Sequence, residues 1–162
     1  MRNKSMHPTA QKVVDAAHHL GLAIEIKEFE SGTRTAEEAA HAVGCKVAQI
    51  VKSLLFIVGT QPTMALVSGS NRLDERKLAN LCGVGRKQVK RSTAETARAI
   101  TGFAIGGVPP FGHASLLPTF IDADLQQFDT IWAAAGTPQT VFAITPPELV
   151  KATHGMVADL KV

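Results

Sequence analysis

The residues best suited to chemistry are a glycine- and proline-rich segment at 106–113 and a single lysine, Lys52, far upstream of it. Gly106 and Gly107 leave backbone N–H groups unshielded by side chains, and the two prolines that follow stiffen the chain. Such a segment can form a fixed pocket, lined by main chain, in which a small polar group is bound. A tight structural turn is the alternative interpretation of the same composition.

Lys52 stands at the entry to a strongly apolar segment, residues 53–58, which is typical of a buried strand. A charged side chain beside a core strand either reaches solvent at the end of the strand or meets an anion. Because an unperturbed lysine has a pKa of about 10.4, Lys52 is expected to act as a cation and not as a base, unless burial lowers its pKa.

Ser68 and Gly69 close the next apolar segment, residues 63–68, just before a predicted helix. A strand-to-helix turn of this composition often exposes N–H groups to a ligand. If the two strands pair, Ser68 and Gly69 would border the same cleft as Lys52. A plain helix cap led by Asp74 is the alternative.

Short helices and strands are predicted to alternate irregularly along the chain. Helices are expected at residues 9–20, 35–43, 74–82, 92–101 and from 146 onward, with Thr9, Thr35, Asp74 and Ser92 as caps. Strands are expected at residues 22–29, 53–58, 63–68, 119–121, 130–135, 140–143 and 156–160. Because turns short enough for hairpins separate the strand pairs, a mixed sheet in an α/β domain of the α+β type is favoured.

Composition indicates one globular domain, since 45% of the 162 residues are hydrophobic and only 19% are charged. We expect residues 1–8 to be flexible and residues 9–162 to form the domain. Cys45 and Cys82 lack the paired spacing of a zinc site or disulfide framework, and no metal or cofactor is expected. No apolar run reaches the length of a signal peptide or membrane span, so the protein is expected to be cytoplasmic.

Basic residues are concentrated between residues 72 and 98, where eight lysines and arginines face three acidic residues. Two interpretations stay open for this segment: a solvated helix face and a patch that contacts phosphates. No aromatic residue is interleaved with the basic ones, so this segment offers no ring on which a base could stack.

Four segments, in order, resemble the YbaK/ProX family of aminoacyl-tRNA deacylases, which is related to the editing insertion of bacterial prolyl-tRNA synthetase. They are T-x-E-E-A-A followed by I-V-K-S-L-L-F within residues 35–56, L-V-S-G at 66–69, the loop at 106–112 and A-A-G at 134–136. The resemblance covers roughly residues 10–160 and no single motif decides it.

This resemblance implies a compact domain with a mixed, barrel-like sheet surrounded by helices. It also implies hydrolysis of the ester that joins a wrong amino acid, such as alanine, cysteine or serine, to the 3′ end of proline tRNA. The tRNA end is the implied partner, with prolyl-tRNA synthetase as a further one, and the protein is expected to be a monomer or weak homodimer. The essential lysine of the family corresponds to Lys52, and its G-x-x-x-P element corresponds to residues 106–110.

Ester hydrolysis needs a positioned water and hydrogen-bond donors for the oxyanion that forms on the carbonyl. Lys52, Gly106 and Gly107 are the expected catalytic residues, with the glycine N–H groups as donors. The expected substrate-binding residues are Val108, Pro110, Gly112, Ser68, Gly69, Gly136 and His113. His113 is a candidate general base, although a loop histidine is more often merely exposed, and Gly136 could equally belong to a hairpin turn.

Two other functions are compatible with the residues. A non-catalytic module that binds an aminoacyl-adenosine or a tRNA end would need the same cation and loop. A nucleotide-handling α/β enzyme is disfavoured, because Gly83 and Gly85 do not complete a G-x-G-x-x-G pattern and no phosphate-loop motif occurs.

Overall fold

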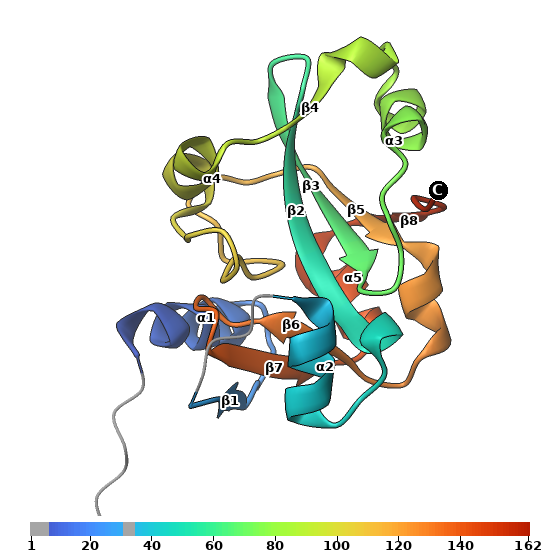
Figure 1. The fold of residues 1–162 in the computed structure, drawn as a ribbon. Coiled ribbons are helices and arrows are strands. Elements are labelled where there is room, and N and C mark those ends of the chain that lie inside the picture. The colour runs from blue at the N-terminus through green and yellow to red at the C-terminus, as the bar shows by residue number, and fades with distance from the viewer. Residues whose placement is uncertain (1–6, 31–34) are drawn as a thin grey trace, which may run out of the picture.

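A computed structural model describes residues 7–30 and 35–162 of the chain (Figure 1). Its α-helices are α1 (Pro8–His19), α2 (Ala36–Val43), α3 (Glu75–Cys82), α4 (Ala94–Thr101) and α5 (Pro146–Thr153). Short 3-10 helices are η1 (Val47–Gln49), η2 (Arg86–Gln88) and η3 (Ala123–Gln127). The strands are β1 (Ile26–Glu28), β2 (Ile50–Val58), β3 (Gln61–Ser68), β4 (Val89–Arg91), β5 (Thr119–Asp122), β6 (Ile131–Ala134), β7 (Thr140–Ile144) and β8 (Met156–Ala158).

All of these strands join one mixed sheet in the order β1-β7-β6-β2-β3-β5-β8, with β4 paired separately to β2. The β2–β3 hairpin is antiparallel, whereas β6 runs parallel to β2 and β5 runs parallel to β3. Figure 1 shows the long hairpin crossing the molecule, with α3 near its turn and α1, α2, β6 and β7 gathered at its other end. The expected mixed α/β domain is confirmed.

Strand β2 organises the sheet because it pairs with three other strands. β3 follows one edge of β2 along almost its whole length, from Val51 opposite Ser68 to Val58 opposite Gln61. On the other edge, β6 pairs only with the first two residues of β2, and β4 pairs only with the last three. In the described part of the chain, residues 52–55 therefore have no strand partner on that edge, which leaves a gap between β6 and β4.

Hydrophobic packing covers both faces of the sheet. Since side chains alternate along a strand, Val51 and Leu55 of β2 face the larger core, to which α1, α4, α5 and the loop after α4 contribute. Phe56 and Val58 face a second cluster that α3 covers. A third, smaller cluster places α2 against Ile50 at the start of β2. No helix among residues 7–30 and 35–162 combines the length and the apolar character that crossing a membrane requires.

Helix boundaries agree with the sequence at α2 and α3 and differ at α1 and α4. Thr35 and Asp74 cap α2 and α3 as expected, each accepting backbone N–H bonds from the first turn. The cap of α1 is His7 and not Thr9, because Pro8 takes the first helical position, where its missing N–H costs nothing. The cap of α4 is Thr93, whereas the Ser92 hydroxyl donates to the Thr93 carbonyl.

The N-terminal region also departs from expectation. Residues 1–6 of the expected flexible segment lie outside the described residues, whereas His7 and Pro8 belong to the start of α1. The strand expected at residues 22–29 is reduced to β1, because only Ile26–Glu28 pairs with β7. Strand β4 and helices η2 and η3 were not predicted from the sequence.

Candidate active site

A cavity of about 320 Å³ opens at the gap in the edge of β2. The first turn of α2 and the first half of β2 form one side, and the loop after α4 faces them. The turn between β6 and β7 closes the far end with Thr137 and Pro138. About half of the lining is alanine, valine, leucine or isoleucine, and its polar side chains are Thr35, Lys52, Ser53, Arg91, Thr137 and Thr140.

Lys52, Gly106 and Val108 all line this cavity. The alternation of β2 places the Lys52 side chain on the opposite face of the strand from Val51 and Ser53, which face the core that contains Val108. Both faces reach the same cavity because it lies across the unpaired edge of the strand. The structure thus brings the lysine and the glycine loop to one cavity, from its two sides.

The Lys52 ammonium is half-buried and donates a hydrogen bond to the backbone carbonyl of Asn71. Burial lowers the pKa of Lys52 below its ordinary value, and the nearby charge of Arg91 acts in the same direction. The carboxylates of Glu37 and Asp122 oppose this effect and favour the cation. The site therefore holds a partly desolvated positive charge, which interacts with an anion more strongly than a fully hydrated lysine does.

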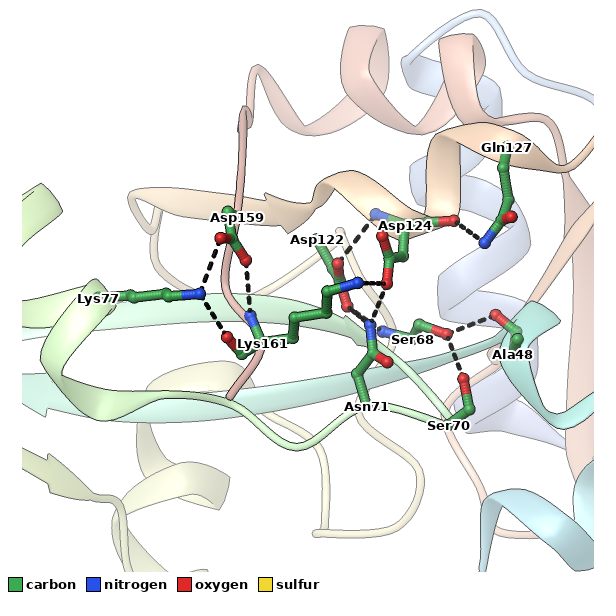
Figure 2. A network of polar contacts seen from close by, with 10 residues as sticks. All are labelled: Ala48, Ser68, Ser70, Asn71, Lys77, Asp122, Asp124, Gln127, Asp159 and Lys161. Carbon is green, nitrogen blue, oxygen red and sulfur yellow. Dashed lines mark hydrogen bonds and ion pairs between the residues drawn. The ribbon is translucent and has the colours of Figure 1, made fainter.

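The Asn71 carbonyl, which accepts the hydrogen bond from Lys52, is held in place by a polar network around the Asn71 side chain, shown in Figure 2. The Asn71 side-chain amide donates to Asp122 Oδ2 at 2.9 Å and to Asp124 Oδ2 at 2.8 Å. Asp122 is almost fully buried and also accepts the backbone N–H groups of Ser68 and Asp124. We call Asn71, Asp122 and Asp124 the Asn71 clamp.

Sequence reasoning missed the Asn71 clamp. Asn71 looked like an ordinary turn residue, and its partner Asp122 is 51 positions away in sequence. The one available signal was an acidic residue at the end of an otherwise apolar strand, where burial demands hydrogen-bond partners.

Ser68 and Gly69 lie beside the Asn71 clamp and do not line the cavity. The Ser68 hydroxyl donates to the carbonyl of Ala48 at 2.7 Å, and its backbone N–H donates to Asp122. A Cβ on Gly69 would lie 2.4 Å from the carbonyl oxygen of Val47, so only glycine fits there. Both residues hold the end of β3 against η1.

The loop after α4 packs closely against the turn between β6 and β7. A Cβ on Gly107 would lie 2.6 Å from the Gly136 carbonyl oxygen and 2.7 Å from Thr137 Cα, so the two backbones touch. The Gly107 N–H is already donated to the carbonyl of Ala104. Of the expected oxyanion donors, Gly107 is therefore engaged within its own loop. The N–H groups of Gly106 and Val108 have no acceptor among the described residues.

Pro110, Gly112 and His113 line a different cavity, of about 270 Å³, between α1, α5 and the following loop. The His113 Nε2–H donates to the Pro109 carbonyl at 2.6 Å. Burial lowers the pKa of His113, which favours the neutral ring, while this hydrogen bond opposes the shift. The structure does not bring these three residues into the cavity that Lys52 lines.

Gly136 lies outside both cavities and supports the loop from behind. Its φ is +101°, and a Cβ there would lie 2.9 Å from the carbonyl oxygen of Thr9. The residue is therefore in a conformation and a space that only glycine accepts, at the point where α1, the turn and the glycine loop meet.

A groove with basic walls leads away from the cavity. Lys52, Leu54 and Arg91 line both the cavity and this groove, so the two spaces adjoin at these residues. Further along, the groove is lined by the arginines at positions 72, 76 and 86, together with Asp74 and Glu75. Part of the basic segment between residues 72 and 98 thus faces a common groove.

The cavity offers two cations, Lys52 and Arg91, two backbone donors and largely apolar walls. Cys45 and Cys82 do not line it, and the one serine that does, Ser53, has no hydrogen-bonded base that could activate it. The arrangement therefore suits binding and polarising a small acyl group and does not present an activated nucleophile. In residues 7–30 and 35–162, no three potential ligands among His, Cys, Asp and Glu cluster as a metal site.

The family model described as "Aminoacyl-tRNA editing domain" matches residues 30–152. The chain belongs to this family. The resemblance seen in the sequence is confirmed, and so is the enzyme class, because editing an aminoacyl-tRNA means removing its acyl group.

Solved and curated relatives agree with this family. A structure described as "Crystal structure of a putative trans-editing enzyme for prolyl tRNA synthetase" superimposes with a TM-score of 0.92, at 46% identity over 98% of this chain and 99% of that one. The Enterococcus faecalis protein named "Putative Cys-tRNA(Pro)/Cys-tRNA(Cys) deacylase EbsC" is 29% identical over 78% of this chain and 76% of its own. A proline–tRNA ligase of Nitratidesulfovibrio vulgaris is 35% identical over 59% of this chain, which corresponds to 16% of that ligase.

Proposed function

We propose that this protein is a trans-editing hydrolase that removes a small wrong amino acid from proline tRNA. The observation that carries the proposal is the single cavity lined by Lys52, Gly106 and Val108 at the head of a basic groove. The names of the relatives, which mention prolyl tRNA synthetase and Cys-tRNA(Pro), support proline tRNA as the carrier. Charged tRNA is made and used in the cytoplasm, which is where we place this activity.

In the proposed reaction a water molecule attacks the carbonyl carbon of the 3′ ester. The carbonyl oxygen becomes an oxyanion and accepts hydrogen bonds from the N–H groups of Gly106 and Val108. The ester C–O bond then breaks, the proton released by the attacking water passes to the ribose oxygen of the terminal adenosine, and free amino acid and tRNA are released. Losing one such donor costs roughly 2.7–4 kcal/mol of barrier stabilisation.

Lys52 is proposed to hold the terminal adenosine and not to move a proton. Lys52 lines both the cavity and the groove, so we expect a phosphate or ribose hydroxyl to reach its ammonium while the acyl group enters the cavity. The Asn71 clamp fixes the carbonyl that Lys52 contacts in the free protein. The arginines of the groove are then available for the phosphates before the terminal nucleotide.

The other expected site residues take supporting roles in this proposal. Gly107 and Gly136 set the position of the loop through their close backbone contact. Pro110, Gly112 and His113 anchor the far side of the same loop, where His113 holds the Pro109 carbonyl. Ser68 and Gly69 support the clamp. Prolyl-tRNA synthetase is proposed as a partner, with the protein acting as a monomer or weak homodimer.

The test is a deacylation panel with proline tRNA charged with alanine, cysteine, serine or proline. The wild type, Lys52→Ala and a remote control, Lys12→Ala on the exposed side of α1, are compared. The proposal expects turnover of at least one mischarged form, loss of that turnover in Lys52→Ala and no change in the control. Tight binding without turnover would instead identify a non-catalytic binding module, and stability of all four esters without binding would reject both functions.

A further inference from the structure

One residue of the cavity wall, Ser53, carries a hydroxyl that the described fold leaves without a hydrogen-bond partner. Ser53 lies in the unpaired stretch of β2, and its Oγ is buried without a hydrogen-bond partner in the described part of the chain. A buried hydroxyl without a partner destabilises a protein, whereas an alanine at the same place would carry no such penalty. A hydroxyl at this position therefore points to a partner that arrives with the ligand.

Comparison with the other hydroxyls of the cavity sets Ser53 apart. The Thr35 hydroxyl accepts the Glu38 N–H at the cap of α2 and donates to the Glu38 carboxylate. The hydroxyls of Thr137 and Thr140 are hydrogen-bonded to each other at 2.7 Å. Among the hydroxyls of the described lining residues, only that of Ser53 has no hydrogen-bond partner.

The surroundings of Ser53 decide which part of an aminoacyl ester it can meet. Its face of β2 carries Val51 and Leu55, and Val108 and Ala133 pack in the same core. Placing the charged α-ammonium of the ester among these side chains is costly, whereas a small neutral hydroxyl can enter and pair with Ser53. A hydroxyl both donates and accepts, so it can satisfy the Ser53 Oγ in either direction.

We propose that Ser53 reads the side chain of the acyl group and selects a small hydroxylated one, that of serine, over alanine. This inference rests on the proposed function and narrows it to one substrate. A thiol is a weaker donor and acceptor than a hydroxyl, so cysteine is expected to be intermediate. A site that hydrogen-bonds a substrate hydroxyl discriminates against the analogue without it, because its own polar group is then left unpaired.

The experiment measures single-turnover deacylation of seryl- and alanyl-tRNA, both prepared on the same proline tRNA. The variants are Ser53→Ala, which removes the hydroxyl, and Ser53→Thr, which keeps it on a residue that strands accept well. Ser115→Ala, on the exposed loop that borders the second cavity, is the matched control. Urea unfolding of each variant accompanies the rates, and Ser53→Ala is expected to be at least as stable as the wild type.

We expect the wild type to favour the seryl ester by about tenfold or more, roughly the value of one neutral hydrogen bond. That preference should disappear in Ser53→Ala and persist in Ser53→Thr and Ser115→Ala. A wild type that prefers the alanyl ester, or a ratio that survives in Ser53→Ala, overturns this inference while leaving the proposed function standing. Failure to cleave either ester, or any other mischarged form, overturns both.

Discussion

Replacing Asn71 with alanine should disable the candidate site without touching any residue that lines it. The substitution removes two amide hydrogen bonds, to Asp122 Oδ2 and to Asp124 Oδ2. Asp124 is partly exposed and keeps its ion pair with Lys161, so losing its bond costs little. Asp122 is buried, and a hydrogen bond to a buried charge is worth about 1.5–3 kcal/mol.

The expected loss of unfolding free energy is therefore roughly 2–3 kcal/mol, measured by urea denaturation. Asp122 retains the N–H groups of Ser68 and Asp124, so the fold should survive. The carbonyl of residue 71 is then held only through the backbone hydrogen bond from its own N–H to the Ser68 carbonyl, so the Lys52 ammonium has a less firmly fixed partner. We expect the deacylation rate to fall about tenfold or more, toward that of Lys52→Ala, a change equivalent to roughly 1.4 kcal/mol or more.

Two comparisons separate positioning from general destabilisation. Asn80→Ala, at an exposed position on α3, should leave both stability and rate unchanged. In a Lys52→Ala background, Asn71→Ala should still lower stability but cost no further activity, because both changes act on the same group. Full deacylation by the single Asn71→Ala variant, or independent losses in the double variant, would refute the reasoning.

Three further predictions follow from the same geometry. Gly107→Ala should lower the free energy of unfolding by about 1–3 kcal/mol and reduce deacylation, because its Cβ must displace the backbone at Gly136. The control is Gly85→Ala, whose Cβ meets no atom within 4 Å and which should change neither urea unfolding nor activity. Equal behaviour of the two variants would contradict this prediction. Affinity for a non-hydrolysable 3′-aminoacyl amide, measured by calorimetry, should fall as pH rises and the Lys52 ammonium loses its proton. Because burial lowers the pKa of Lys52, this fall should begin at a lower pH than the usual lysine pKa of 10.5 would give. Lys52→Arg should remove the fall, because arginine keeps its charge. Burial likewise lowers the pKa of His113 below 6.5, so the unfolded chain binds more protons than the folded one. The free energy of unfolding should therefore drop as pH falls through 6.5. A His113→Gln variant with the same dependence on pH would show that the buried ring is not responsible.

Local elements of the fold could be predicted because local chemistry determines them. The caps Thr35 and Asp74 and the β2–β3 hairpin follow from residue types a few positions apart. Strand β4 could not be predicted, because its three residues, Val89–Arg91, carry two exposed basic side chains and pair only through contact with β2. The gap between β6 and β4 depends on that pairing, so the position of the cavity could not be predicted from the sequence either.

The candidate site shows the same division. Lys52 and the segment at 106–108 could be selected by composition, but only the tertiary fold places them at one cavity. The segment continues at Pro110 into a second cavity, because Phe111 turns into the core and carries the chain past α1. The hydrogen bonds of Asn71 join it to residues distant in sequence, and the burial of the Ser53 hydroxyl without a partner depends on the tertiary fold, so no local pattern contains either feature.

The most direct test of the account is an amide NMR titration with a non-hydrolysable 3′-aminoacylamino-adenosine. The proposed site predicts that the backbone N–H signals of Gly106 and Val108 shift together, with the Lys52 side chain responding at the same ligand concentration. Gly85, which lines neither the cavity nor the groove, should not respond. Shifts that gather around Gly112 and the second cavity instead, with Gly106 and Val108 unmoved, would contradict the central claim.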